Sequence, residues 1–349
     1  MKCNAADGLF YEVAIVKRSL PTVEVLHSPP VTLWEKIIKN CEHATFFHSP
    51  TWVRILEKTY PEYSNATLGF VFSSGNRAIL PLVAERPKGK FSRKIKHKSM
   101  ALGVYGGILA EKRLNSEETE ALFEHLTSTD IRDLKLVENP MDQYTPPSNF
   151  VAKPMATHIV TLNSDFEQLI KRISRGRIRN IKEAEKRGVT VRLAVSLKDY
   201  EQYYRSYQES LKKWGDKTGT TYHWELFFNI FKTQDPGIKL WLAEKDEKII
   251  AGVLAFYCNN TILLWHGYSL PEYMDDYPSS LLHMAMLKDG CANGYKHYDL
   301  NPSVERKGVI QFKESLSAKR LDFKAYHWKR KRLIPWKRKK TLSQTESFG

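Results

Sequence analysis

The spacing of apolar residues predicts helices and strands in alternation along the chain. Apolar positions three and four residues apart predict helices at 31–41, 50–60, 116–127, 164–188, 196–211, 224–231, 279–291 and 308–315. Alternating or short apolar runs between turn residues predict strands at 12–26, 68–72, 78–85, 99–110, 134–137, 189–195, 239–244, 249–257, 261–267, 296–300 and 321–327. This succession predicts a mixed α/β fold.

Both halves of the chain repeat one order of elements, from helices through a β-meander to a further helix and a strand. The proline-rich stretch 140–154 between them has the composition of a linker. We therefore predict two mixed α/β domains, at 1–155 and 156–328, followed by a basic tail at 329–349.

Local signals mark several helix ends. Ser116 is the predicted N-cap of its helix, and Ser164 with Glu167 forms a predicted capping box. Gly176 lies inside the helix predicted at 164–188, and we expect it to divide that helix in two.

The composition is that of a soluble globular protein, with 42% apolar and 27% charged residues. The longest apolar run, 249–258, is too short to span a bilayer, and the first residues carry no apolar core of a secretory signal. Four widely spaced cysteines favour reduced cytosolic thiols over disulfides or a zinc site. The histidines show no ligand spacing with carboxylates, so we expect no metal and no cofactor.

The net charge of +15 is concentrated in two segments. Residues 171–187 contribute +6 and residues 329–340 contribute +8, so the rest of the chain carries only +1. Local patches of this kind indicate contacts with phosphates or with an anionic membrane surface. In the tail the cations are interleaved with Leu333, Ile334 and Trp336, which suits a membrane surface, a tRNA or a merely solubilising segment.

One face of the basic helix carries a row of cations, namely Arg175, Arg179, Lys182 and Lys186. Like charges at this spacing repel by a few tenths of a kcal/mol per pair, and a polyanionic ligand would remove that cost. The functional interpretation is a phosphate site. The alternative is a solvated helix face, with Glu183 and Glu185 supplying part of the compensation.

Asp299 is the candidate carboxylate. It ends a predicted strand, and carboxylates at the C-terminal ends of strands in α/β folds often face a ligand crevice. There it would orient an amine nucleophile or take its proton. The alternative is an Asx turn, which the following Asn301-Pro302 favours.

Four stretches together resemble the Fem-type peptidoglycan bridge aminoacyltransferases, a family with two tandem GNAT domains. They are Phe-Phe-His-Ser-Pro-Thr-Trp at 46–52, Ala-Ile-Leu-Pro-Leu at 78–82 with Tyr-Gly-Gly at 105–107, the basic run 177–189, and Asp-Leu-Asn-Pro at 299–302 with Gly-Val-Ile-Gln-Phe-Lys at 308–313. The family pattern has glycine where Asn301 stands.

The resemblance implies a tandem GNAT fold and an enzyme that forms an amide on an amine of a cell-envelope precursor, with aminoacyl-tRNA as donor. It implies a cytoplasmic enzyme of peptidoglycan biosynthesis that acts at the inner face of the membrane. Lys313 would face the active cleft and hold a phosphate or stabilise an oxyanion, although a lysine snorkelling past Phe312 is the alternative. Tyr105 and Gly106 would belong to a substrate loop, for which a plain tight turn is the alternative. The family's acid has no clear counterpart, Glu111 being the nearest.

The loop 273–280 bears on the donor. Acetyl-CoA-dependent GNAT enzymes place a glycine-rich loop here, whereas this loop has no glycine and carries Asp275 and Asp276. Acids at a helix N-terminus oppose a pyrophosphate, which favours aminoacyl-tRNA over acyl-CoA. The alternative enzyme is a CoA-dependent N-acyltransferase that modifies an amino sugar of an exported polysaccharide. A non-catalytic RNA- or membrane-binding protein with a GNAT-like fold is the alternative of another class.

Overall fold

A computed structural model describes residues 21–87, 94–99, 101–163, 165–214, 221–302 and 306–330. Their α-helices are α1 (Val31–Asn40), α2 (Pro50–Thr59), α3 (Ser116–Ser128), α4 (Phe166–Arg172), α5 (Arg175–Lys186), α6 (Leu197–Trp214), α7 (Trp224–Lys232), α8 (Pro278–Ala292) and α9 (Lys307–Ser315). Two 3₁₀ turns are η1 (Phe46–His48) and η3 (Pro271–Asp276). Residues 12–20 of the first predicted strand, Ser164 and nearly all of the basic tail lie outside the described residues.

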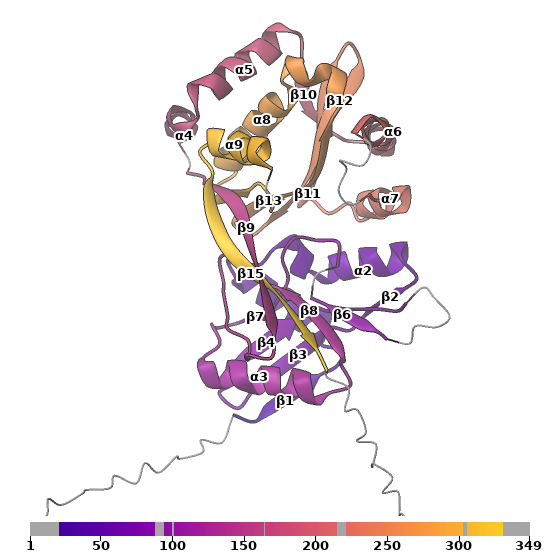
Figure 1. Ribbon diagram of the computed structural model, residues 1–349, viewed down its shortest axis with the longest axis vertical. Helices are drawn as coiled ribbons and strands as arrows, with labels where there is room; N and C mark the ends of the chain where they lie inside the picture. Colours follow the sequence, from indigo (N-terminus) through magenta and orange to yellow (C-terminus); the bar gives the residue numbers. More distant parts are fainter. Residues whose placement is uncertain are drawn as a thin grey trace, which may run out of the picture.

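The strands form two sheets (Figure 1). The smaller sheet has the order β1-β3-β4-β7, from β1 (Val23–Leu26), β3 (Leu68–Phe72), β4 (Arg77–Leu80) and β7 (Leu109–Ala110). The larger has the order β10-β11-β12-β13-β14-β9-β15-β8-β6-β5-β2, from β2 (Tyr63–Asn65), β5 (Val83–Glu85), β6 (Lys96–Lys98), β8 (Asp133–Val137), β9 (Val151–Thr161), β10 (Thr190–Leu193), β11 (Ile238–Lys245), β12 (Lys248–Cys258), β13 (Thr261–Ser269), β14 (His297–Asp299) and β15 (Lys319–Lys329).

The antiparallel pair β9 and β15 joins the two halves of the molecule (Figure 1). β9 pairs with β14 of the second half at one end, and β15 pairs with β8 of the first half at the other. The prediction of a linker up to residue 154 was wrong at its end, because the strand begins at Val151. Pro154 is tolerated since this part of β9 pairs only with β15, so its missing N–H interrupts no second ladder.

The strand predicted at 99–110 is mostly a buried loop, and only β7 at its end is a strand. Leu102 has φ +58° and Gly107 has φ +93°, values that a strand does not allow. The indole N–H groups of Trp52 and Trp265 donate to the carbonyls of Ala101 and Leu102, at 3.1 and 2.7 Å. Side chains from both halves therefore replace a strand partner.

Three further expectations change at element ends. Asn115, not Ser116, caps α3, with Glu118 completing the capping box. The basic helix is divided before Ser174, which caps α5, rather than at Gly176. The apolar run 78–85 divides at Pro81 into β4 and β5, which belong to different sheets.

Aromatic rings pack the halves against each other on the side of α2 and α7. Phe46 stacks on Phe256 at 4.6 Å between ring centroids, and Trp52 meets Trp265 edge-on at 5.6 Å. All four are buried in one core cluster that draws residues from both halves. Burial of large apolar side chains across the junction favours one rigid body over two independently moving domains.

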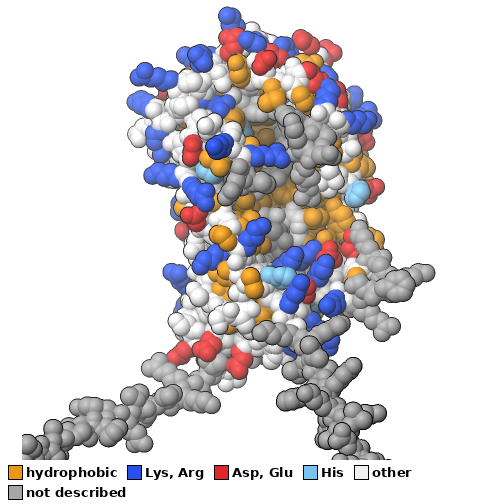
Figure 2. All heavy atoms as spheres, in the orientation of Figure 1, with side chains coloured by type: hydrophobic (Ala, Val, Ile, Leu, Met, Phe, Trp, Pro, Cys, Tyr) orange, Lys and Arg blue, Asp and Glu red, His pale blue; other side chains and the backbone are white. Residues whose placement is uncertain are grey.

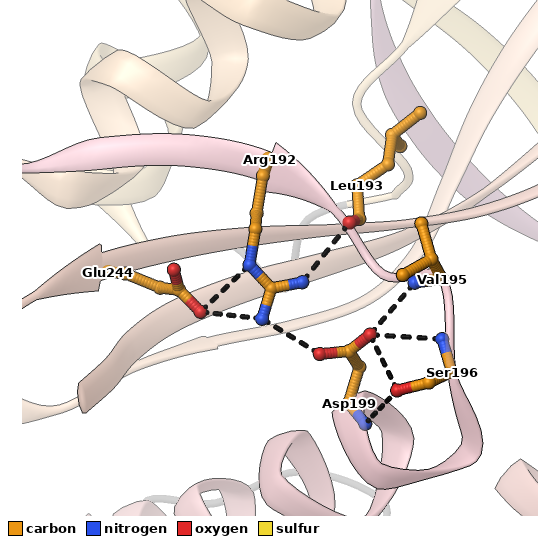
Figure 3. Close-up of polar contacts among 6 residues, drawn as sticks. All are labelled: Arg192, Leu193, Val195, Ser196, Asp199 and Glu244. Atoms are coloured by element: carbon orange, nitrogen blue, oxygen red, sulfur yellow. Dashed lines mark hydrogen bonds and ion pairs between the residues drawn. The ribbon is translucent and has the colours of Figure 1, made fainter. Parts of the chain in front are cut away.

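A charge cluster fixes the start of α6 (Figure 3). Arg192 on β10 donates to Glu244 on β11 at 3.0 and 2.7 Å and to Asp199 at 2.7 Å. The other oxygen of Asp199 accepts the N–H groups of Val195 and Ser196 at 2.8 and 3.0 Å. Burial opposes ionisation of Asp199, but Arg192 and these N–H groups outweigh it and lower the pKa of Asp199 to about 2.

Asp199→Asn is expected to lower the free energy of unfolding at pH 7 by about 1–2 kcal/mol, after allowance for the partly exposed Arg192. The pKa of this aspartate is lower in the folded chain than its ordinary value of 3.8, so its stabilisation is present above pH 4 and is lost as pH falls toward 2. Urea unfolding at pH 7 and pH 3 measures both effects. Asp130→Asn, an exposed site, serves as control; a loss for Asp199→Asn equal to the control's would contradict the prediction.

Candidate active site

Asp299 lies where two parallel strands part. β13 and β14 pair only from Thr261 to Leu263 against His297 to Asp299, while β13 continues to Ser269. Beyond this point the Asn301 side-chain amide donates to the Trp265 carbonyl at 3.3 Å. Beyond Asp299 the chain therefore has no strand pairing with β13, although the Leu300 N–H still donates to the His158 carbonyl on β9 at 2.9 Å.

The carboxylate of Asp299 is 1% exposed and accepts three hydrogen bonds. The Thr157 hydroxyl on β9 donates at 2.6 Å and the Asn301 N–H at 2.9 Å to one oxygen, and the Tyr105 hydroxyl donates at 2.8 Å to the other. Asn301 has φ +66°, a left-handed conformation that asparagine tolerates and glycine adopts freely. The Asx turn weighed as an alternative is therefore present, and it is part of a buried network.

The ionisation of Asp299 is set by opposing effects. Burial is the largest effect and raises the pKa of Asp299 above its usual value. The hydroxyls of Thr157 and Tyr105, the Asn301 N–H and the nearby Lys313 act in the opposite direction, because they favour the charged form. Burial also raises the pKa of Tyr105 well above its usual value, so this phenol stays protonated and donates. With all three donors directed at it, Asp299 holds the local geometry rather than presenting a free oxygen to a ligand.

Lys313 lies beside this turn on α9 and is 6% exposed. Its ammonium donates to the Asn301 carbonyl, while the Asn301 N–H donates to Asp299. Both side chains therefore hold the backbone of the same residue. Burial lowers the pKa of Lys313 to about 8, against the attraction of Asp299. A compact cation held here can stabilise developing negative charge at an attacked carbonyl.

Arg177 is a candidate that sequence reasoning missed. It reaches inward from α5 and donates to the hydroxyls of Ser280 on α8 and Ser315 on α9, at 2.7 and 3.0 Å. Its guanidinium lies 4.1 Å from the centroid of the Phe312 ring, and burial lowers its pKa. No carboxylate among the described residues pairs with it, so it brings a half-buried positive charge to the first turn of α8. Helical periodicity could have identified it, because it places Arg177 on the opposite face of the helix from the four exposed cations.

The four cations predicted to grip phosphates, Arg175, Arg179, Lys182 and Lys186, are all exposed. Figure 2 shows Lys and Arg side chains gathered over the end of the molecule where α5 lies. None makes an ion pair with a described residue. Arg177 on the opposite side of α5 reaches α9, which carries Lys313, whereas these four side chains are exposed to solvent.

Of the residues predicted in the first half, Tyr105 and Gly106 lie at the Asp299 network and Glu111 does not. Tyr105 is buried against Asp299, and Gly106 is held by its backbone, whose N–H donates to Val137 at 3.1 Å. Glu111 instead pairs with Arg77 at 2.6 Å, away from this network.

The acidic loop before α8 is less negative than its sequence indicates. Asp276 pairs with Lys245 at 2.9 Å and with Arg187 at 3.6 Å. Only Asp275 remains exposed without an ion pair to a described residue. Asp275 is therefore the one acid of this loop that still disfavours a pyrophosphate at the start of α8. The nearby positive charge of Arg177 favours one.

A hollow of about 810 Å³ opens in the first half, between the start of α3 and the loop 141–147. Its wall includes Ile108, two residues beyond Gly106. Neither Tyr105 nor Asp299 is among the residues that line it. The residues that line it are His43, Ile108, Ala110, Arg113, Leu114, Asn115, Ser116, Thr119, Glu120, Phe123, Met141, Asp142, Gln143, Tyr144, Thr145, Pro146 and Pro147.

Two features are absent from the described residues. No group of three or more His, Cys, Asp or Glu side chains there is arranged to hold a metal ion. Among those same residues, no helix combines the length and the apolar character needed to cross a bilayer.

Comparison with known proteins supports the fold predicted from the sequence. Residues 171–314 match the family described as "Acetyltransferase (GNAT) domain". The crystal structure of FemX superposes with a TM-score of 0.64 at 13% identity, covering 86% of this chain and 96% of that one. A conserved protein from Bacteroides thetaiotaomicron VPI-5482 gives 0.56 at 11% identity, covering 88% and 100%.

L-PGS from Bacillus licheniformis gives a TM-score of 0.53 at 13% identity, covering 87% of this chain and 94% of that one. None of the curated proteins compared matches the chain. The mixed α/β fold with tandem GNAT-like domains, similar to that of FemX, is confirmed, and the GNAT match supports an acyltransferase.

Lys313→Met is expected to stabilise the protein at pH 7 by about 2 kcal/mol. The pKa of Lys313 is about 8 in the folded chain and 10.5 ordinarily, so the unfolded chain binds more protons between these values. The stability of the unmodified protein therefore rises from pH 8 to 10.5, and the advantage of the variant shrinks over the same window. Chemical denaturation at pH 7 and 10 measures this, with the exposed Lys288→Met as control; equal effects at both sites would refute it.

Proposed function

We propose that this chain is an acyltransferase that forms an amide on an amine of a cell-envelope precursor, with aminoacyl-tRNA as donor. The observation that carries the proposal is the buried Asp299–Lys313 network where β13 and β14 part. Its setting is a FemX-like tandem fold with a GNAT match over the second half. A structure similar to this chain is titled the C-terminal domain of a "Putative Lysylphosphatidylglycerol Synthetase" from Agrobacterium fabrum, which is in keeping with an envelope acceptor.

The proposed reaction needs no covalent intermediate with the protein. The acceptor amine attacks the ester carbonyl of the donor, a C–N bond forms, and the C–O bond to the leaving hydroxyl breaks. The amine loses a proton and the departing oxygen gains one. Lys313 stabilises the oxyanion between these steps, while Asp299 orients the turn through Asn301.

Each substrate has a proposed place. The exposed cations of α5 would contact the phosphates of a tRNA, because they form a row without internal ion pairs and without exposed apolar side chains between them. The hollow lined by Ile108 and Tyr144 would hold the part of the acceptor that does not react. We place the enzyme in the cytoplasm, at the inner face of the membrane, where the tail would contact anionic lipid.

A CoA-dependent N-acyltransferase acting on an amino sugar of an exported polysaccharide is the second candidate. Arg177 favours it, because this half-buried cation and the Ser280 hydroxyl lie at the first turn of α8. The neutralisation of Asp276 by Lys245 removes part of the objection to a pyrophosphate there.

The donor is tested by titrating the purified protein with charged tRNA, uncharged tRNA and acyl-CoA at two salt concentrations. We expect saturable binding of charged over uncharged tRNA. The double variant Arg179→Ala, Lys182→Ala should weaken tRNA binding several-fold and reduce the slope of log K against log salt by roughly 1–2. Lys288→Ala serves as the matched control. Micromolar binding of acyl-CoA without tRNA binding would replace the first candidate by the second.

Lys313→Ala is expected to lower kcat by roughly 10²–10³-fold, the effect of removing one oxyanion donor. Because the pKa of Lys313 is about 8, the rate of the unmodified enzyme should fall above pH 8 as the ammonium loses its proton. Lys307→Ala on the exposed side of the same helix is the control. Asp299→Asn should also lose activity, and retention of full function in both variants would favour a pure binding protein.

A further inference from the structure

We propose that His48 is a positioning residue for this site: it holds the Gly106 carbonyl and thereby sets the Tyr105 hydroxyl against Asp299. The inference rests on the proposed function for its catalytic consequence. Its structural part stands on hydrogen bonds that cross from the first half of the chain to the second.

The hydrogen bonds of His48 determine its tautomer. The Thr45 backbone N–H donates to Nδ1 at 3.1 Å, so Nδ1 presents its lone pair. The hydrogen of the neutral ring is then on Nε2, which lies 3.0 Å from the Gly106 carbonyl and donates to it. The side chain is 0% exposed, and burial lowers its pKa to about 4, which keeps the ring neutral.

The backbone that carries this imidazole is also held in place. The Trp34 indole on α1 donates to the His48 carbonyl at 2.6 Å, and Ser49 caps α2 directly afterwards. His48 therefore has little freedom to follow a moving loop. A donor fixed in this way imposes its position on the carbonyl that it binds.

Only one residue, Tyr105, lies between this restraint and the Asp299 carboxylate. Tyr105 directly precedes Gly106, and its ring packs edge-on against Phe323 at 5.3 Å. On the other side, Gly107 has φ +93°, and a Cβ there would lie 2.9 Å from the Tyr144 hydroxyl. With its backbone held at Gly106, the tyrosine places its hydroxyl 2.8 Å from Asp299.

Removal of the imidazole would leave the Gly106 carbonyl without this donor and allow the loop to relax. Asp299 would then lose one of three donors, and the attraction it exerts on Lys313 would change. His48 itself touches no reacting atom. A misplacement of about 1 Å at a site of this kind costs up to roughly 100-fold in rate.

The test uses the full chain with His48→Ala, His48→Gln and the exposed His27→Gln as control. Two NMR readouts need no substrate: ¹⁵N shifts of the histidine rings and the pKa of Lys313 from its ¹³Cε shift. We expect a neutral Nε2–H tautomer for His48 from pH 5 to 8, and a Lys313 pKa that moves in His48→Ala but not in the control. In transfer assays His48→Ala should lower kcat roughly 10- to 100-fold with little change in KM. His48→Gln should recover part of the loss, because an amide can accept from Thr45 and donate to Gly106.

Each contrary outcome overturns the proposal. An Nδ1–H or protonated ring, an unmoved Lys313 pKa, or full kcat in a folded His48→Ala would do so. If His48→Ala does not fold, the ring shifts of the unmodified protein and the partial activity of His48→Gln decide instead. If the unmodified protein transfers no acyl group from any donor, the proposed function fails, while the two NMR readouts still decide the role of His48.

Discussion

Burial of the Asp299 carboxylate is the constraint on which the site depends. A charged group removed from water needs several donors, because an unpaired carboxylate in the interior costs far more than folding can offset. Its donors come from β9, from its own turn and from the loop of the first half that carries Tyr105. The site is therefore complete only when both halves of the chain are packed together.

The packing that brings the halves together has two parts. The backbone part is the pairing of β9 with β15, which continues one sheet across the junction. The side-chain part is the aromatic cluster around Trp52 and Trp265, whose indoles also hold the loop before Tyr105. The same residues thus supply apolar burial and position a loop whose own backbone forms almost no ladder.

Positive charge on α5 is divided between two environments. Arg177 points inward to hydroxyls at the start of α8, where burial makes its charge costly and a bound anion would compensate it. The cations on the opposite face remain in water, where each interaction is worth little singly and a polyanion would gain from all of them. One short helix can therefore contact both an enclosed group and an extended partner.

Most helices and strands and the candidacy of Asp299 could be predicted from the sequence, because periodicity and strand ends are local properties. The tandem GNAT-like class and the candidacy of Lys313 came instead from the resemblance of four short stretches to a known family. The sequence did not determine the strand through Pro154, whose single ladder neighbour is remote in sequence. Only the tertiary structure joined Tyr105 to Asp299, 194 residues apart, and brought His48 to the loop between them. The physical reason is that a hydrogen-bond partner for a buried group is selected by packing across the whole chain, which no local pattern records.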